Sequence, residues 1–549
     1  MKKYLIPLLI LLSSPVFAWE TVGEGIEYRE YTLPGPNNVF VSRMYRHNPN
    51  AGMTIMTAND RRKGNQTIGD QLDLYDGKVL FDGKDWGKRL KPVVGVNGDF
   101  YLGGGASRTL RVADGYMAYP MLDDQSIWGG FYATFGGDMF ISGSAVRSSS
   151  VTLICPSGKS FDISAVNSDL PENGAAIYNY KYGLSAPAAD TVAVIDPGGP
   201  WLVGTTSGDV VSLGKGEEET VIPFDRCVVA ANGDIAKELA ENLKTGTKVK
   251  IKTVIKAKLN DIDIPEEKFA GLSESLIGSQ IVLQDGGVIA NEGIELMTDR
   301  HPRTVLAYND DYLYFMVCDG RRKGVSIGMT GVELGEFCRD ELNADFAVNM
   351  DGGGSSTMIT NGTLRNKPSD GKQRAVANGF VMYNTLPEER SDAFLPCQKV
   401  EVKDDEYNIR TGPGKSYPVI TTVNKGAIGR VTPHKLCGIK AGNHYWSQVN
   451  FYYNVTGWIT EDALIGGDPD NEPPTDPGNF RKTESGKIYV VYAWEASEDD
   501  YGVSHYNIYK NGVLSRTTKR TSFVGITTDG DVYSVSAVDY AGNESNKVK

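Results

Sequence analysis

Short apolar runs that end in glycines, acids or amides recur along the first 395 residues. Residues 93–96, 312–318 and 346–350 are such runs, and their length and flanking turn residues predict buried strands. Stretches with apolar residues three or four positions apart lie between them and are typical of helices. The pattern therefore predicts an α+β domain, a mixed sheet with helices, over residues 19–395.

Two helices are predicted in this domain. Residues 235–243 place three apolar side chains on one helical face before Gly246. Thr330 and Glu333 have the spacing of a capping box and begin a second helix. This helix lies between the runs that end at 318 and begin at 346. The two strands could be parallel neighbours joined by a crossover, which would bring the acids that follow them to one edge.

The rest of the chain alternates apolar and polar residues and predicts two all-β domains. Residues 398–466 predict a barrel that resembles a bacterial SH3 domain, which implies a cell-wall or glycan-targeting module; a spacer is the alternative. Residues 467–478 form a linker rich in proline and acids. Residues 479–549 predict a β-sandwich around Trp494 and resemble a fibronectin type III domain.

The N-terminus and the overall charge limit where the protein acts and on what. Residues 1–18 have the charged, apolar and small-residue regions of a secretory signal, so a secreted, periplasmic or cell-surface location is expected, with no transmembrane segment. The formal net charge of −13 argues against nucleic acid and anionic membranes as partners. The six cysteines have no zinc-finger spacing, and Cys318 with Cys338 is the first disulfide to test.

One passage, residues 346–357, combines an apolar strand with candidate chemistry. Asp351 follows the strand, and then come three glycines, Ser355, Ser356 and Thr357. A tight glycine turn can leave backbone N–H groups, such as those of Gly352 and Gly353, pointing into a concavity that binds an anion. A carboxylate beside such a cradle suits a water attacking near a phosphate. A glycine hairpin with a capping aspartate is the alternative, and the passage alone does not decide between them.

Four further clusters place acids, amides and arginines beside apolar strands. Each has a simpler explanation, namely turn chemistry, a surface salt bridge, mutual pairing or an ordinary loop. Their recurrence at strand ends favours a ligand site, because open sheets bind ligands there. The candidate residues are Asn97 and Asp99, His301 and Arg303, Asp319 and Arg321, and Arg374 at the end of the loop 366–374.

These motifs, in this order, resemble the phosphodiester glycosidase family over about residues 90–385. The motifs that carry the resemblance are Asn97-Gly98-Asp99-Phe100-Tyr101, His301-Pro302-Arg303-Thr304, Asp319-Gly320-Arg321, Ser326-Ile327-Gly328-Met329-Thr330, the passage 349–358, and Asn366-Lys367-Pro368-Ser369-Asp370-Gly371 with Arg374. The family has a small residue or glycine at the position of Asp99, so an additional carboxylate here would alter the local charge.

The resemblance implies hydrolysis between a sugar anomeric carbon and a phosphodiester oxygen, on envelope or extracellular glycans. Asp351 is the first choice for the carboxylate that activates water or shields charge at the sugar, with Asp319 second and Asp99 beside them. His301 is a further acid or base. The leaving phosphate would be held by Asn97, Arg303, Arg321, Gly352, Gly353, Ser355, Ser356, Thr357 and Arg374.

Two other classes of function stay open. A metal-dependent phosphodiesterase cutting at phosphorus would need clustered ligands, and residues 19–395 hold only His47 and His301. No cofactor is required, although an all-carboxylate magnesium or calcium site is conceivable. A non-catalytic glycan-binding surface protein would suit the two C-terminal domains equally well. The expected partners are a phosphorylated glycan or sugar phosphodiester, and peptidoglycan or an envelope glycan through the SH3-like domain.

Overall fold

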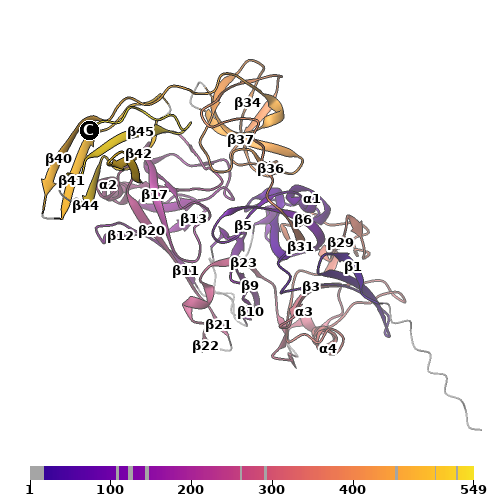
Figure 1. Ribbon diagram of the computed structural model, residues 1–549. Coiled ribbons are helices and arrows are strands. Elements are labelled where there is room, and N and C mark those ends of the chain that lie inside the picture. The colour runs from indigo at the N-terminus through magenta and orange to yellow at the C-terminus, as the bar shows by residue number, and fades with distance from the viewer. Residues whose placement is uncertain are drawn as a thin grey trace, which may run out of the picture. The chain divides into compact units, whose positions relative to one another are not determined.

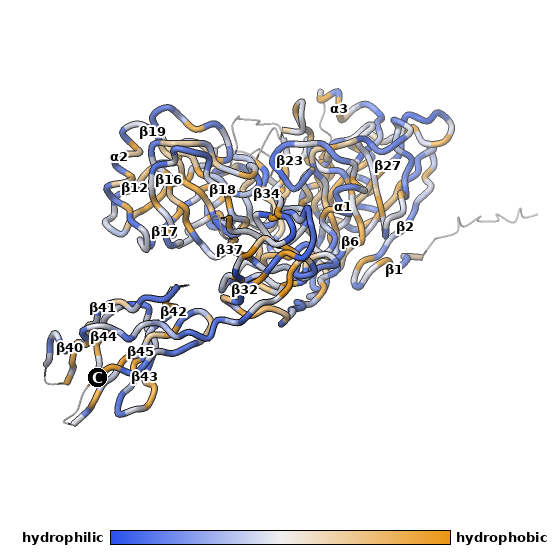
Figure 2. Tube along the Cα trace, turned by 90° about the horizontal axis from the view of Figure 1, so that it is seen from above, coloured by the Kyte–Doolittle hydropathy of each residue, from blue (hydrophilic) through white to orange (hydrophobic). Residues whose placement is uncertain are grey.

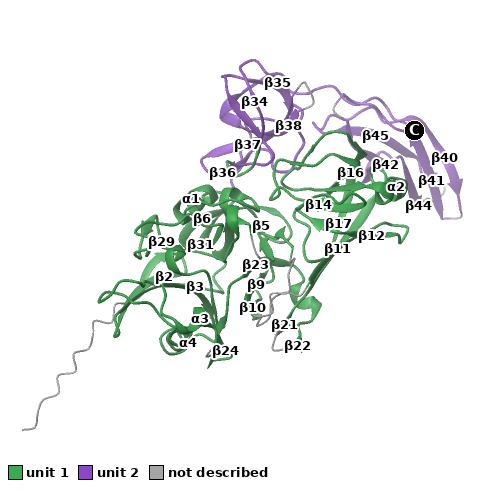
Figure 3. Ribbon diagram, turned by 180° about the vertical axis from the view of Figure 1, so that it is seen from behind, with its two compact units in different colours: residues 1–387, 415–418 green, residues 388–414, 419–549 purple. Residues whose placement is uncertain are grey.

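The computed structural model describes residues 18–106, 110–120, 128–142, 148–259, 262–289, 293–451, 455–486, 488–500, 502–526 and 530–549. The predicted signal, residues 1–18, therefore lies almost wholly outside the described residues. The chain divides into two compact units, residues 1–387 with 415–418, and residues 388–414 with 419–549 (Figure 3). No described helix is long and apolar enough to cross a membrane.

Two stacked sheets covered by helices form the part of the first unit that carries the candidate motifs (Figure 1). The first sheet has, in order, β1 (Glu20–Gly23), β2 (Ile26–Leu33), β3 (Asn37–Tyr45), β27 (Tyr312–Cys318), β26 (Arg303–Tyr308), β28 (Phe346–Asn349), β24 (Ile281–Gln284) and β25 (Gly287–Val288). The second has β30 (Thr363–Leu364), β29 (Met358–Thr360), β6 (Trp86–Asn97), β31 (Asn378–Leu386) and β4 (Ala51–Thr57), with β5 (Val79–Phe81) on β6.

Side-chain alternation along the strands builds the layers. In β26, Leu306 packs into the core between the sheets, whereas Val305 and Ala307 face the cluster formed with α4 (Gly331–Asp340). In β31, Phe380 enters the core between the sheets, and Val381 faces α1 (Ile68–Tyr75). Figure 2 shows hydrophobic residues along such strands. The order of layers is therefore helix, sheet, sheet, helix.

The predicted helices and strands are found, but the predicted parallel pairing of residues 312–318 with 346–350 is wrong. All pairings in these two sheets are antiparallel. The strands β27 and β28 are not neighbours, because β26 lies between them and pairs with both. They still run in the same direction, so Asp319 and Asp351 leave the sheet at the same edge. The capping box of Thr330 and Glu333 is confirmed at the start of α4.

The first unit has two further large sheets, besides two small two-stranded ones. One has β10 (Met139–Ser142), β9 (Gly130–Thr134), β23 (Leu272–Ile277), β7 (Arg111–Ala113) and β8 (Tyr116–Tyr119). The other has β12 (Ser160–Ile163), β11 (Ser148–Ile154), β20 (Lys248–Lys256), β17 (Gly204–Gly216), β16 (Ala189–Asp196), β19 (Cys227–Asn232), β14 (Gly174–Tyr178) and β13 (Ala165–Val166), with α2 (Gly233–Asn242). In these two sheets the β13–β14 pair alone is parallel.

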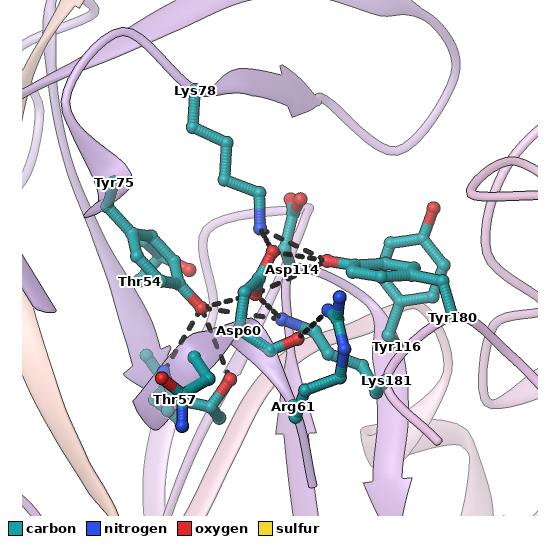
Figure 4. A network of polar contacts seen from close by, with 12 residues as sticks. Thr54, Thr57, Asp60, Arg61, Tyr75, Lys78, Asp114, Tyr116, Tyr180 and Lys181 are labelled. Atoms are coloured by element: carbon teal, nitrogen blue, oxygen red, sulfur yellow. Dashed lines mark hydrogen bonds and ion pairs between the residues drawn. The ribbon is translucent and has the colours of Figure 1, made fainter. Parts of the chain in front are cut away.

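A buried ionic network lies in the first unit, centred on Asp60, just after β4 (Figure 4). The Asp60 carboxylate is fully buried and accepts bonds from Lys78 Nζ at 2.8 Å and from Lys181 Nζ. The Tyr75 hydroxyl donates to it at 2.7 Å, and the Tyr180 hydroxyl at 3.3 Å. Burial opposes ionisation of Asp60, but the two ammonium groups outweigh it and hold the pKa well below its ordinary value.

The second unit is built from strands. The barrel has β34 (Val419–Val423), β33 (Tyr407–Arg410), β38 (Val455–Thr460), β37 (His444–Phe451), β35 (Ile428–Val431), β32 (Lys399–Val402) and β39 (Leu464–Gly466), with β36 (Ile439–Ala441) on β37. Two three-stranded sheets follow, β40 (Gly478–Ser485), β41 (Tyr489–Glu495) and β44 (Ser522–Ile526), and β43 (Val513–Thr518), β42 (Val503–Lys510) and β45 (Tyr533–Asp539). Trp494 lies in the core of this last part, whose relation to fibronectin type III stays a prediction.

Candidate active site

A pocket of about 300 Å³ opens where β6 and β28 end and β26 begins. Strand ends that converge at one edge expose their following loops to a shared space. The lining residues come from six separate stretches of the chain, namely Phe100, Leu296, His301 to Arg303, Arg321, Asn349 with Asp351 to Gly354, and Arg374. The structure thus brings four of the motifs and the glycine passage to one concavity.

Asn97 ties these stretches together. Its Nδ2 donates to the backbone oxygen of Asp351 at 2.7 Å, and its Oδ1 accepts from Thr304 Oγ1 at 2.7 Å and from the N–H of Thr357 at 3.1 Å. The side chain is buried and makes three bonds to three separate segments. Asn97 therefore fixes the position of Asp351 and does not line the pocket, which makes a direct contact with substrate phosphate the weaker interpretation.

Asp351 is the one carboxylate among the described residues that line this pocket. Burial raises the pKa of its carboxyl to about 6, and the charge of Asp99 adds to the rise. Hydrogen bonds from Ser355 and the N–H of Gly352, and the charge of Arg374, counteract the rise in part. The group is ionised in most molecules at neutral pH and gains a proton just below it.

The glycines let two guanidinium groups approach the backbone. Gly353 has φ +63°, and a Cβ placed there would lie 3.1 Å from Nη2 of Arg321. A Cβ on Gly354 would overlap Nη2 of Arg374. Any larger residue at either position would push an arginine away from the pocket. The close approach of cations beside Asp351 explains Gly353 and Gly354, whereas a Cβ on Gly352 would meet the carbonyl oxygen of Pro302 at 2.6 Å.

The expected cradle of backbone N–H groups is corrected by the hydrogen bonds. The N–H of Gly353 donates to Pro302 at 2.9 Å, and that of Gly352 interacts with the carboxylate of Asp351. The N–H groups of Ser355 and Ser356 donate to carbonyls within the turn. These donors are already used, so positive charge near the pocket comes mainly from arginine side chains.

The three predicted arginines occupy different environments. Arg321 is exposed, and it forms no ion pair within the described part of the chain. Arg374 pairs with Asp370 at 2.7 Å and donates to Ser355 Oγ at 3.2 Å. Arg303 is buried, and its guanidinium donates to the carbonyl oxygens of Met329, Leu296 and Asp299 at 2.6–2.9 Å. Arg303 thus mainly braces the wall, whereas Arg321 is available to a ligand.

His301 and Arg303 belong to the same sequence motif, and both line the pocket. The Nδ1 of His301 is buried and lacks a hydrogen-bond partner among the described residues. Burial and the charges of Arg303 and Arg321 lower the pKa of His301 below 6.5. The ring is therefore neutral at pH 7, with one nitrogen left for a proton transfer or a ligand.

Asp319 and Asp99 are not among the residues that line this pocket. Asp319 accepts from Asn366 Nδ2 at 3.1 Å and from the N–H of Lys367 at 3.1 and 3.2 Å, and it lines a different pocket. Asp99 is buried between Arg111, 3.6 Å away, and Asn378. The geometry places Asp319 as a loop anchor and Asp99 as a buried charge behind Asp351.

The three hydroxyl residues that follow the glycines also differ in their contacts. Ser355 bonds to Arg374 and Asp351, whereas the buried hydroxyls of Ser356 and Thr357 have no partner among the described residues and do not line the pocket. The motifs included Phe100, Pro302 and Asn349 but gave them no role, and they did not include Leu296. Asn349 was visible as the polar break in its apolar strand, but Leu296 reaches the pocket from a segment with no chemical signal.

The structure also bears on metal ligands and on cysteine pairs. The described residues contain no group of three or more His, Cys, Asp or Glu side chains arranged to hold a metal ion. The six cysteines are present as free thiols. Cys318 and Cys338 lie in the same buried cluster, Cys338 within α4 itself, yet they do not form the disulfide predicted between them.

Comparison with known proteins supports part of this account. Residues 201–383 match the family model described as phosphodiester glycosidase, and residues 405–464 match that of the bacterial SH3 domain. The first match includes the motifs from His301 to Arg374, and the motif 97–101 lies outside it. The family match supports a glycosidase-type function for the first unit.

Individual relatives cover less of the molecule. Chitinase Chi52 of Paenibacillus xylanexedens is 38% identical over 80 residues, which are 14% of this chain and 15% of that protein. A hypothetical protein from Synechocystis has a TM-score of 0.42 and 17% identity, covering 68% of this chain and 64% of that one. The zebrafish N-acetylglucosamine-1-phosphodiester alpha-N-acetylglucosaminidase catalytic domain has a TM-score of 0.30 and 13% identity, covering 68% and 86%.

Proposed function

We propose that the first unit hydrolyses the bond between a sugar anomeric carbon and a phosphodiester oxygen, releasing free sugar and a phosphomonoester. The family match to residues 201–383 favours this chemistry. The observation that carries the proposal is that Asp351, whose pKa is raised to about 6, lines one pocket together with Arg321 and Arg374.

A single carboxylate is enough for this chemistry. The transition state of glycoside cleavage is oxocarbenium-like, and positive charge develops at the anomeric carbon. The group that leaves is a phosphate monoester, which departs as a stabilised anion, so protonation of the leaving oxygen is less necessary than in ordinary glycosidases. Asp351 in its ionised form stabilises the sugar carbon or activates the water that attacks it.

The leaving phosphate is held by cations. Arg321 has no competing carboxylate among the described residues and supplies the planar fork that binds two phosphate oxygens. Arg374 already pairs with Asp370, so its contribution depends on release from that partner. The neutral His301, which lines the same pocket, is the further group that would exchange a proton with water or with the phosphate.

A product assay tests the proposal. The protein is incubated with a sugar-1-phosphodiester, and reducing sugar, phosphomonoester and sugar phosphate are quantified, with Asp351→Asn as the control. Reducing sugar with phosphomonoester, lost in the variant, supports the proposal. A sugar phosphate product would instead indicate a phosphodiesterase that cuts at phosphorus. Binding without any product would indicate a non-catalytic glycan-binding protein.

The place of action belongs to the same proposal. The signal-like residues 1–18 and the bacterial SH3 match at 405–464 favour a secreted or periplasmic enzyme that acts on envelope glycans. The second unit would hold it near peptidoglycan or a related polymer. Sedimentation of the full chain with purified cell walls, compared with an unrelated acidic protein of similar size, tests this targeting role.

A further inference from the structure

A second pocket of about 270 Å³ is lined by three cationic side chains, although the chain as a whole is strongly acidic. The cations are Arg322, Arg365 and Lys367. A concentration of positive charge in a protein of net charge −13 needs a local explanation, and a pocket lined by guanidinium groups selects oxygen anions.

The two carboxylates of this pocket already have partners. Asp319 accepts two or more N–H bonds from residues 366–367 and lies 3.7 Å from Arg322 Nη1. Glu30 accepts from the Tyr28 hydroxyl at 2.7 Å. Three cations against two engaged carboxylates leave the pocket net positive.

One donor of the lining has no acceptor. Arg365 Nε is buried and has no hydrogen-bond partner among the described residues. A buried donor without a partner costs free energy, so a ligand that accepts from it is favoured. This observation is independent of the charge and also indicates an acceptor-rich ligand.

The linings of the two pockets meet at adjacent residues of the chain. Arg321 lines the first pocket and Arg322 the second, and adjacent Cα atoms are about 3.8 Å apart. Asn366 ties the second pocket to the turn after the glycines, because its Nδ2 donates to the Ser356 carbonyl at 2.9 Å and to Asp319 at 3.1 Å. The two linings are therefore joined through neighbouring loops.

We propose that the second pocket is a subsite for another phosphate of the same substrate, so that the enzyme takes a glycan chain bearing successive phosphates. This inference rests on the proposed function for its catalytic step but not for its binding step. Arg365 and Arg322 would grip the second phosphate while the first lies against Arg321. The subsite would act on affinity for long, polyanionic substrates and leave short ones unaffected.

Phosphate binding is tested first with inorganic phosphate, in the full chain carrying Asp351→Asn so that nothing turns over. Phosphorus NMR titrations are recorded for this protein and for versions that add Arg365→Gln, Arg321→Gln or, as a matched surface control, Arg339→Gln. Two sites are expected, with Arg365→Gln weakening one about tenfold and Arg321→Gln the other. A titration unchanged by Arg365→Gln in a folded protein overturns the inference.

The second arm asks whether that phosphate belongs to the substrate. N-acetylglucosamine-1-phosphoglycerol is compared by calorimetry with the same compound carrying a second phosphate on the glycerol. The second phosphate is expected to tighten binding about tenfold, and Arg365→Gln to abolish that gain alone. Equal binding of the two compounds, with inorganic phosphate still bound, would mean a site for free phosphate and contradict the subsite.

Failure of the catalytic proposal is separable from failure of this one. If the protein with Asp351 intact releases no sugar from either compound while the two titrations behave as expected, the subsite stands and the glycosidase proposal falls. If sugar is released from both compounds but Arg365→Gln leaves binding and KM unchanged for each, the glycosidase stands and the subsite falls.

Discussion

Asp60 is fully buried and Asp351 is half-buried, and each lies near two cationic side chains that act on it differently. Lys78 and Lys181 contact Asp60 directly, and no pocket opens onto it among those described here in the first unit. Arg374 is engaged with Asp370 beside Asp351, and Arg321 contacts neither acid. The pKa of Asp60 is lowered, whereas that of Asp351 is raised to about 6.

The difference shows how one arrangement serves stability and the other chemistry. Direct ion pairs with hydrogen bonds from two tyrosines satisfy Asp60, so it holds β4 and the segment around Lys181 together and has nothing left to offer a ligand. Asp351 forms no ion pair with a cationic side chain among the described residues, so burial keeps the pKa of its carboxyl raised in the folded state. Its unpaired charge and the open Arg321 are available to a substrate.

The largest effect is expected at Asp351. Asp351→Asn should lower kcat/KM by about 10²–10⁴-fold, because the reacting sugar loses its carboxylate. The pKa of the carboxyl is raised on folding, so ionisation destabilises the native state as pH rises from about 4 to 6. The variant at pH 7 should therefore melt no lower than the parent. Asp340→Asn, on the surface of α4, is the control. A variant that keeps its activity would contradict the assignment.

An opposite result is expected at Asp60. Asp60→Ala should reduce the free energy of unfolding by about 3–5 kcal/mol, because it leaves two ammonium groups buried without a partner. Urea denaturation measures the loss, and Glu238→Gln, in the exposed pair with Lys159, should change stability by less than about 1 kcal/mol. If Asp60→Ala were as mild as the surface variant, the network would not be a stability element.

Arg321 and Arg303 sharpen the comparison within the pocket. Arg321→Gln should cost about 2–4 kcal/mol of transition-state stabilisation and leave the melting temperature unchanged. Arg303→Gln should instead lower the melting temperature, since its guanidinium binds three backbone carbonyls. Steady-state kinetics and calorimetry on both variants separate these effects. Equal losses of activity, with both variants fully stable, would assign Arg303 to the phosphate instead.

The smallest effects are shifts in pH dependence. We expect kcat/KM to rise with pH through about 6, as Asp351 loses its proton. Asp99→Asn should move that midpoint down, because the charge of Asp99 raises the pKa of Asp351. Arg374→Gln should move it up, because its charge lowers the pKa. Shifts in the same direction for both variants would show that the midpoint belongs to another group.

The sequence predicted the local elements of the site better than their pairing. Apolar runs identified β27 and β28, and the spacing of Thr330 and Glu333 identified the start of α4. Nothing local in the sequence shows that β26 inserts between those strands, because strand order depends on contacts distant in sequence. The prediction of neighbouring parallel strands failed for that reason.

Residue types predicted the site but not the division of labour within it. Arg303 and Arg321 are the same residue type in the sequence. Only the backbone carbonyls that accept bonds from Arg303 show that it has a structural role, whereas Arg321 can bind a ligand. Lys181 gave no signal of pairing with Asp60, because 121 positions separate them. Burial and partners, which decide both pKa and availability, are properties of the folded chain.

Hydrolysis in ¹⁸O-labelled water tests the central claim most directly. A sugar-1-phosphodiester is cleaved by the full chain, and the phosphomonoester product is examined by phosphorus NMR for the isotope. Attack at the anomeric carbon predicts a phosphate without label, with Asp351→Asn forming little product. Label in the phosphate would show cleavage at phosphorus and contradict the account.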